Sequence, residues 1–479
     1  MLTPVLVALL AIAALAAAAV LARRWLRGVG RQTVLRFRAR LDRYKLVRRQ
    51  VVRAELARDP RVLEAIAAHA AERGLPRGVV ADRVESYIDE MVPFFNVLSY
   101  YKIGYNLARL FTGLFYKVTV EYQDEEALGR IPKRDVLVYV MNHRSNMDYV
   151  VVTYVLAGVV SISYAVGEWA RTWPLEYIFK SFGSYLVRRR YREPLYHTVL
   201  ERYVQLITRN RVTQGLFPEG GLTRDGTLRP AKLGILDYVL RTVRDPAFEG
   251  DIWVVPVGIN YDRVLEDRTL TRELVVGAPP LSRWAQLVGL IRFVGGNLTR
   301  ALSGQGRRYG RAAVTFGAPV SVRGWFAGER GGWLDLPKGE RLPRVAQFAA
   351  AVMERVGAIL PVTPVTLVAA ALLSFQSSVV TDVALRERLD HLRDRLRAAN
   401  ARIVRDELPV EEVWERAWRT FRSRGFVVRE GQSLVILPSA RPLLEYYANS
   451  IRHLLPEEAR WDLSPAAGDD PSLPRLQPI

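Results

Sequence analysis

Short apolar runs alternate with helical segments over residues 117–325, and this alternation restricts the fold more than any other feature of the chain. Helical patterns fit between the runs at 149–156, 171–181, 193–209 and 231–243. Strands that alternate with helices are typical of a layered α/β domain. We therefore predict a mixed sheet flanked by helices. Its strands are expected at 117–122, 135–140, 161–166, 183–187, 212–217, 252–257 and 312–316.

The N-terminus carries an uncharged apolar run of 18 residues, from Val5 to Ala22. At 1.5 Å per residue, such a helix spans about 27 Å, close to the thickness of a hydrocarbon core. Four arginines follow the run and no Lys or Arg precedes it, so the positive-inside rule places the rest of the chain in the cytoplasm. A cleaved signal peptide is the alternative, but its basic n-region is missing; a shallow or re-entrant helix is another. We predict an anchor over residues 1–22 in the inner (plasma) membrane, with the rest of the chain in the cytoplasm.

The charge is unevenly distributed. The chain has a formal net charge of +20, and residues 23–80 contribute +11 of it, from 16 basic and 5 acidic side chains. A basic segment beside an anchor gains free energy at an anionic leaflet. The alternatives are a solvated helix face and a genomic preference for arginine, since 62 of the 69 basic residues are Arg. No recognised nucleic-acid-binding module occurs, so we expect membrane lipids and no nucleic acid as partners.

The segments outside the α/β domain are predicted to be mostly helical. A basic helical region covers residues 23–116, including an aromatic-rich helical stretch at 85–116. A mostly helical C-terminal region covers 326–455, and a disordered tail covers 456–479. Within the C-terminal region we expect a buried helix at 362–375, amphipathic helices at 381–400 and 410–424, a hairpin formed by 426–429 and 434–437, and a last helix at 442–455.

A histidine and an aspartate follow the predicted strand 135–140, where α/β folds place ligand sites. His143 and Asp148 are five residues apart and cannot share one helix face. They can meet if His143 lies in the turn and Asp148 in the first helical turn. The carboxylate would then fix the imidazole tautomer, and the pair could remove a proton from a hydroxyl. The alternative is a turn histidine followed by an ordinary charge at the start of a helix.

Two further segments supply groups that suit an anionic ligand. The loop Phe217–Gly226 contains Glu219, Gly220, Gly221 and Arg224, and its glycines allow close approach of backbone amides to a phosphate. The stretch Gly183–Arg190 ends in Arg188, Arg189 and Arg190, a candidate anion site. A tight turn and ordinary surface charge are the alternatives. A fourth segment, Val254–Val257, reads as a strand with a proline.

Together these four blocks resemble the motifs of the glycerol-phosphate acyltransferase superfamily, in residue type, order and spacing. Five segments are similar to its sn-1 branch, the glycerol-3-phosphate and dihydroxyacetone-phosphate acyltransferases: Arg58–Pro60, His143–Tyr149, Pro256–Arg263, Val362–Pro364 and Leu444–Asn449. The resemblance touches most of residues 55–455.

The resemblance implies acyl transfer from acyl-CoA or acyl-carrier protein to the sn-1 hydroxyl of glycerol 3-phosphate in phospholipid biosynthesis. It makes His143 the general base and Asp148 its orienting partner, with the phosphate held by Arg188, Arg189, Arg224 and the amides of Gly220 and Gly221, and with Glu219 organising the loop. It implies no cofactor and no metal. Direct attack on the thioester is favoured, because the chain has no cysteine and no serine-elbow motif.

One departure from the family pattern concerns the acceptor. Leu222 stands where members of this branch usually carry an arginine, so that only Arg224 remains in the third motif. A charged hydrogen bond contributes about 1.5–3 kcal/mol, so its loss weakens phosphate binding. Lysophosphatidate or dihydroxyacetone phosphate as acceptor, and a non-catalytic lipid- or phosphate-binding role, therefore stay open.

Overall fold

The computed structural model describes residues 43–96, 100, 104–157, 160–171, 175–188, 191–272, 309–328, 332–375, 377–457 and 460–461. The predicted anchor at 1–22, the basic residues 23–42 and the tail beyond residue 461 lie outside the described residues. Within the described part of the chain, no helix combines the length and the apolar character needed to cross a membrane.

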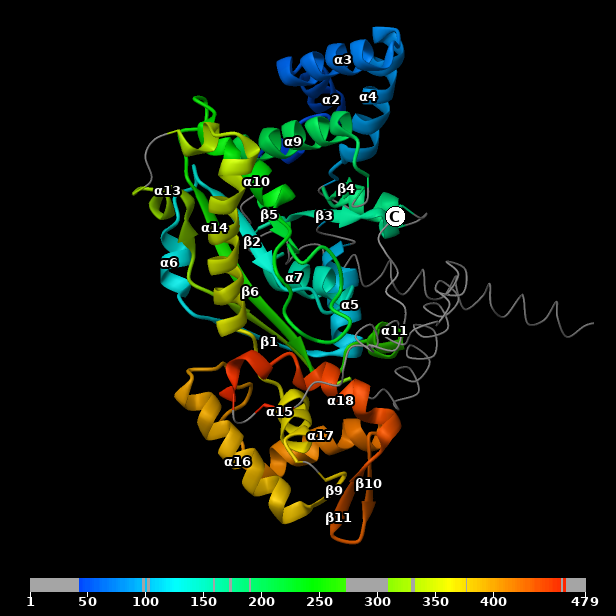
Figure 1. Ribbon diagram of the computed structural model, residues 1–479, viewed down its shortest axis with the longest axis vertical. Coiled ribbons are helices and arrows are strands. Elements are labelled where there is room, and N and C mark those ends of the chain that lie inside the picture. Colours follow the sequence, from blue (N-terminus) through cyan, green and yellow to red (C-terminus); the bar gives the residue numbers. More distant parts are fainter. Residues whose placement is uncertain are drawn as a thin grey trace, which may run out of the picture.

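A mixed sheet of eight strands forms the middle of the molecule (Figure 1). The five strands from β6 to β4 run parallel, whereas β7 and β1, parallel to each other, run antiparallel to β6. The predicted α/β layered fold is confirmed. The strand order is β1 (Lys117–Tyr122), β7 (Arg311–Phe316), β6 (Ile252–Tyr261), β2 (Val136–Met141), β5 (Gln214–Leu216), β3 (Ser163–Gly167) and β4 (Tyr185–Val187), and β8 (Val320–Ser321) pairs with β6.

Strand β2 lies at the centre of the sheet and is buried along its whole length. Its side chains alternate between the two faces, as the pleat requires. Leu137, Tyr139 and Met141 join one hydrophobic core, and Val136 and its alternate neighbours join the other. The first core extends into α7 (Met147–Leu156) and the C-terminal region; the second includes α9 (Pro194–Arg209), α10 (Gly234–Leu240), α14 (Lys338–Ala358) and the N-terminal helices. Helices therefore cover both faces.

Strand β6 is longer than predicted, since it continues to Tyr261 instead of ending at Val257. Pro256 lies inside it, an unusual place for a residue without a backbone N–H. On that side the partner of β6 changes from β8, which pairs with Trp253 and Val254, to β7, which begins at Val257. Pro256 falls in the gap between these two ladders. The strand can therefore run on and carry Tyr261 toward the end of β2.

The N-terminal helices are α2 (Arg49–Ala57), α3 (Pro60–Arg73), α4 (Arg77–Met91) and α5 (Tyr105–Phe115), after a short 3-10 turn at Arg43–Leu46. Helices α2, α3 and α4 lie at the top of Figure 1 beside α9, whereas α5 lies lower, against α7. The helical stretch predicted at 85–116 is present as two helices, since α4 ends at Met91 and α5 begins at Tyr105. Pro93 explains this end: a residue before proline avoids the helical region, and Val92 has φ −70° and ψ 116°.

The C-terminal region is built around α15 (Pro364–Leu373), all of whose residues are buried. This confirms the buried helix predicted at 362–375. Around it pack α16 (Asp382–Ala398), α17 (Val410–Arg424) and α18 (Arg441–Ala448) (Figure 1). The predicted hairpin is present as β10 (Val427–Glu430) and β11 (Ser433–Ile436), and β9 (Val379–Thr381) adds a third strand. Trp461, within the predicted disordered tail, is buried and donates from its indole to Asn449.

The remaining short helices connect these layers: α6 (Glu125–Arg130), α8 (Leu175–Ser181), α11 (Asp267–Arg272) and α13 (Val322–Trp325), with 3-10 turns at Glu168–Ala170, Arg241–Arg244, Trp333–Asp335, Pro438–Ala440 and Arg452–Leu454. Among them, α11 matters for the site, because it contacts α18.

Candidate active site

The loop of residues 142–146 joins the end of β2 to the start of α7. Asn142 fixes this loop to the neighbouring strand: its side-chain Nδ2 donates to the carbonyl of Ile259 over 2.9 Å, and its Oδ1 accepts from the amide of Ile259 over 2.8 Å. The side chain therefore continues the β2–β6 ladder where the main chain of β2 turns away. This holds the following histidine at the carboxyl end of the parallel strands, where α/β folds bind ligands.

The structure brings His143 and Asp148 into contact. The Nδ1 atom of His143 lies 2.9 Å from Oδ2 of Asp148. Both side chains are buried, with 2% and 0% exposed. His143 lies in the turn and Asp148 in the first turn of α7, the arrangement that their spacing required.

The carboxylate of Asp148 is held from several sides. Its Oδ2 also accepts the backbone amides of Arg144 over 2.8 Å and Ser145 over 3.1 Å. Its Oδ1 accepts the hydroxyl of Tyr261 over 2.6 Å. A buried carboxylate requires such donors to remain charged. The charged acceptor in turn keeps the proton of His143 on Nδ1, which makes Nε2 the basic atom of the ring.

Aromatic rings surround His143. Phe217 stacks on the imidazole with ring centres 4.2 Å apart, and Tyr149 meets it edge-on at 5.4 Å. None of the described residues forms a hydrogen bond with Nε2 of His143. The ring is held by contacts on its face and edge and by the hydrogen bond at Nδ1, so that Nε2, the atom suited to proton transfer, faces no protein partner among the described residues.

Glu219 links the loop after β5 to the loop after β2. Its Oε1 accepts the amide of His143 over 2.9 Å, and its Oε2 accepts the amide of Arg229 over 3.2 Å. Burial raises the pKa of Glu219 to about 7, although these two hydrogen bonds oppose the shift. The amide of Thr223 also donates to the carbonyl of His143 over 3.0 Å. Both loops are therefore fixed to each other on either side of the His143 peptide.

Gly220 is required by the shape of this loop. Its φ of +74° is one that side chains rarely adopt, and a Cβ there would lie 2.6 Å from the side chain of Lys232. Gly221 and Leu222 are half-buried, and Leu222 packs against the hydrophobic core. Arg224 and Lys232 are exposed cations on the same loop. Lys232 was missed from the sequence, and only the close approach at Gly220 identifies it.

Arg188 is engaged in the structure. Its guanidinium forms an ion pair with Glu90 of α4, with Nε–Oε1 at 3.0 Å and Nη2–Oε2 at 2.5 Å. The rings of Tyr87, Tyr191 and Tyr196 lie 4.9–5.7 Å from its central carbon. Arg188, which was predicted to bind the phosphate, is therefore paired with the carboxylate of Glu90 in this structure. Arg189, the adjacent candidate, lies outside the described residues.

Four residues of the site were missed as site residues: Arg144, Tyr261, Glu266 and Tyr446. Glu266 accepts the hydroxyl of Ser145 over 2.7 Å and the amide of Asn146 over 3.2 Å. Tyr261 and Tyr446 lie in segments that carried the family resemblance, so those segments were the available signal. Nothing in the sequence around Glu266 distinguished it.

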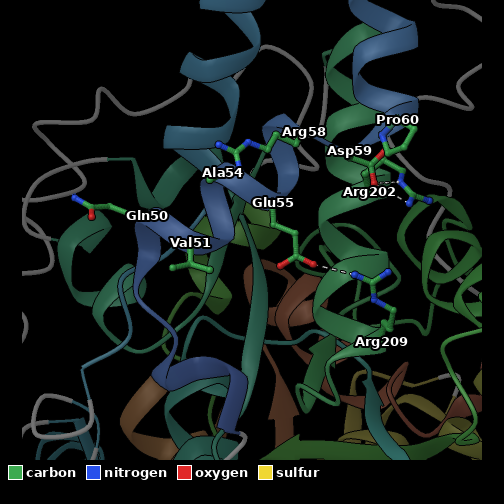
Figure 2. Close-up of a pocket in the computed structure, with 9 residues that line it drawn as sticks. All are labelled: Gln50, Val51, Ala54, Glu55, Arg58, Asp59, Pro60, Arg202 and Arg209. Carbon is green, nitrogen blue, oxygen red and sulfur yellow. Dashed lines mark hydrogen bonds and ion pairs between the residues drawn. The ribbon is translucent and has the colours of Figure 1, made fainter.

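An open hollow elsewhere in the molecule has a different character. It lies between α2 and α9, and four of its charged lining residues form two ion pairs (Figure 2): Arg209 with Glu55 over 2.9 Å and Arg202 with Asp59 over 2.8 Å. It contains no histidine and lies on the side of the N-terminal helices. In the part of the chain that the structure describes, no group of three or more His, Asp or Glu side chains is placed to hold a metal ion.

Two family models match parts of this chain. Residues 120–260 match the family described as Acyltransferase, and residues 296–463 match the Glycerol-3-phosphate acyltransferase C-terminal region. The α/β domain that carries His143 and Asp148 is thus an acyltransferase domain. The second match follows it along the chain, so residues 296–463 are similar to the C-terminal region of glycerol-3-phosphate acyltransferases.

Individual relatives are distant. A glycerol-3-phosphate acyltransferase of Aeromonas hydrophila is 27% identical over 425 residues, which are 86% of this chain and 50% of the relative. One of Actinobacillus succinogenes is 26% identical over 422 residues, with the same coverage. The chain therefore spans about half the length of the curated relatives it matches. The crystal structure of the 1-acyl-sn-glycerophosphate (LPA) acyltransferase from Thermotoga maritima covers 64% of this chain and 96% of its own, at 18% identity and a TM-score of 0.31.

Proposed function

We propose that this protein transfers a fatty acyl group from an acyl thioester to the sn-1 hydroxyl of glycerol 3-phosphate, with His143 as general base. The contact between His143 Nδ1 and Asp148 Oδ2 at 2.9 Å is the observation that carries the proposal. The names of the two relatives described above support glycerol 3-phosphate as acceptor.

The reaction follows from the orientation of the imidazole. Nε2 of His143 takes the proton of the acceptor hydroxyl while the oxygen attacks the thioester carbonyl carbon. Asp148 stabilises the imidazolium that forms. The tetrahedral intermediate collapses with cleavage of the C–S bond, and the imidazolium returns its proton to the leaving thiolate. The products are an ester and a free thiol, without an acyl-enzyme.

The phosphate of the acceptor would bind at the loop after β5, through Arg224 and the amides of Gly220 and Gly221. Lys232 adds a second exposed cation at the same loop. Arg188 joins this set when the phosphate replaces Glu90 as its partner, and Arg189 is a further candidate. Glu219 holds the loop rather than the ligand, because both of its oxygens accept backbone amides.

The donor and the setting are part of the same proposal. An acyl-CoA or an acyl-carrier protein supplies the thioester, and the apolar run Val5–Ala22 with its following arginines anchors the chain to the inner membrane, where anionic lipids meet the basic segment. The catalytic domain then faces the cytoplasm, where both donors occur.

The test is an acceptor panel with the purified full-length chain. Glycerol 3-phosphate, dihydroxyacetone phosphate and lysophosphatidate are each offered with acyl-CoA or acyl-carrier protein, and His143→Ala serves as the blank. We expect 1-acyl-glycerol 3-phosphate as the main product. Preferential acylation of another acceptor would replace the substrate in this proposal, and phosphate binding without any product would favour a non-catalytic role.

A further inference from the structure

Arg144, the neighbour of His143, is a buried cation. Its side chain is 1% exposed, and no carboxylate of the described residues lies within ion-pair distance of it. Its guanidinium instead donates to two backbone carbonyls, that of Gly226 over 2.9 Å and that of Tyr446 over 3.3 Å. The ring of Tyr446 lies 4.6 Å from its central carbon. A buried charge needs such compensation, and most of it comes from one residue of α18.

The main chain of Arg144 ties this contact to the catalytic pair. Its amide donates to Oδ2 of Asp148, the oxygen that faces His143, over 2.8 Å. Its carbonyl accepts the hydroxyl of Tyr446 over 3.2 Å. Tyr446 therefore contacts Arg144 at both ends. Its ring and its backbone carbonyl contact the guanidinium, and its hydroxyl donates to the backbone carbonyl of Arg144. A shift of Tyr446 would move a hydrogen-bond donor of Asp148.

The helix α18 also lies directly on the loop after β5. A Cβ on Gly226, which has a φ of +86°, would lie 1.9 Å from the carbonyl oxygen of Tyr446. Asn449 donates from its side chain to the carbonyl of Asp225 over 2.9 Å. This loop includes Thr223, whose amide binds the carbonyl of His143. The C-terminal region thus reaches His143 through two loops, one on each side.

We propose that Tyr446 is a positioning residue for the His143–Asp148 pair, and that the C-terminal region is part of the catalytic unit. Tyr446 acts through Arg144: its ring and backbone carbonyl stabilise the buried guanidinium, and its hydroxyl holds the Arg144–Ser145 peptide, whose N–H donates to Oδ2 of Asp148 over 3.1 Å. This inference rests on the proposed acyl transfer, and it goes beyond it by assigning a role to a residue 303 positions away from His143 in the sequence.

The test compares two substitutions at Tyr446 that remove different parts of its contact. Tyr446→Leu removes ring and hydroxyl, and we expect kcat to fall about 10- to 100-fold with KM for glycerol 3-phosphate within about threefold, since the loss concerns orientation and not binding. Tyr446→Phe keeps the ring over Arg144 but loses the hydroxyl that holds the Arg144 carbonyl, so we expect a smaller fall in kcat than in Tyr446→Leu. Trp414→Phe, a substitution in the buried core of the same region, is the stability control.

Coupling is measured with a double mutant. Arg144→Gln removes the guanidinium that the ring of Tyr446 contacts, so Arg144→Gln with Tyr446→Leu should lose no more activity than the worse single variant. A kcat of Tyr446→Leu within twofold of the native chain would overturn the proposal. An equal fall in kcat for Tyr446→Leu and Trp414→Phe, at equal melting temperatures, would also overturn it, because the fall would then reflect the loss of stability in this region.

A second readout does not depend on turnover. With isotope-labelled histidine, the proton on Nδ1 of His143 that is hydrogen-bonded to Asp148 gives a distinct NMR resonance. We expect this resonance to shift or vanish in Tyr446→Leu and to persist in Trp414→Phe. An inactive native chain would count against the proposed function alone, whereas an unchanged resonance in Tyr446→Leu would overturn the positioning role.

Discussion

The hydroxyl of Tyr261 donates a 2.6 Å hydrogen bond to Oδ1 of Asp148, the oxygen that does not face His143. Burial raises the pKa of Tyr261 well above its ordinary value, and the charge of Asp148 adds to this, so the hydroxyl stays protonated and remains a donor. The tyrosine at the end of β6 thus fixes the rotation of the Asp148 carboxylate, which in turn orients the imidazole.

Replacing Tyr261 by Phe leaves one oxygen of a buried carboxylate without this donor. A hydrogen bond to a charged group contributes about 1.5–3 kcal/mol, which corresponds to a fall in kcat of about 10- to 100-fold if the bond acts fully in the transition state. KM for the acceptor should change little. Steady-state kinetics beside Tyr203→Phe, a buried tyrosine on α9, measures this. Equal kcat for the two variants would remove Tyr261 from the site.

Glu219 gives the protein a specific dependence of stability on pH. Burial raises its pKa from an ordinary value of 4.5 to about 7. A carboxyl group whose pKa is raised by folding stabilises the protein below pH 4.5, and this contribution is lost as the pH rises through about 7. Relative to Glu219→Gln, the native chain should therefore lose stability between these pH values.

The measurement for Glu219 is the melting temperature of both chains from pH 4.5 to pH 8. The variant has a constant cost, because an amide supplies one acceptor where the carboxylate supplies two. Only the change of the difference with pH reports on the titration. Parallel curves for the two chains would show that Glu219 does not titrate in this range.

The ion pair between Glu90 and Arg188 predicts an effect on acceptor binding. If Arg188 exchanges Glu90 for the phosphate, Glu90→Gln removes the competing carboxylate. KM for glycerol 3-phosphate should then fall about three- to tenfold, the range expected for loss of a partly exposed charged competitor. Glu85→Gln, an exposed acid on the same helix, is the matched control. An increased KM in Glu90→Gln would mean that the carboxylate orients Arg188 for binding instead.

The family resemblance leads us to expect an arginine where this chain carries Leu222. We expect Leu222→Arg to lower KM for glycerol 3-phosphate, because a second guanidinium contributes about 1.5–3 kcal/mol per charged hydrogen bond. The half-buried leucine packs against the core, so the melting temperature should fall as well. Leu222→Met keeps the apolar contact and should change neither value. If KM of Leu222→Arg equals that of Leu222→Met, the phosphate does not bind near this position.

The sequence contained much of the fold because its local patterns and its tertiary packing agree. The alternating runs predicted the sheet, the spacing of His143 and Asp148 predicted a turn followed by a first helical turn, and the apolar stretch after Pro361 predicted a buried helix. Each of these depends on residues close together in the chain. The prediction did not say where the helices within 85–116 end, although the effect of Pro93 on the preceding residue is local.

Contacts between distant segments were the part that could not be predicted. Glu90 reaches Arg188 across 98 positions, and Tyr446 reaches Arg144 across 302. Neither pattern nor propensity specifies which acid pairs with which arginine, because many arginines in this chain are equivalent by type. The structure therefore changed the picture of Arg188 from an open phosphate ligand to a paired residue, and added Tyr261 and Tyr446 around Asp148.

The rate of acyl transfer by His143→Ala tests the central claim most directly. The matched control is His391→Ala, an exposed histidine on α16. Both are assayed with acyl thioester and saturating glycerol 3-phosphate, at confirmed equal folding. Loss of a general base lowers kcat by about 10²- to 10⁴-fold, so we predict a fall in this range for His143→Ala and none for His391→Ala. An undiminished rate in His143→Ala would contradict the assignment of His143 as the base.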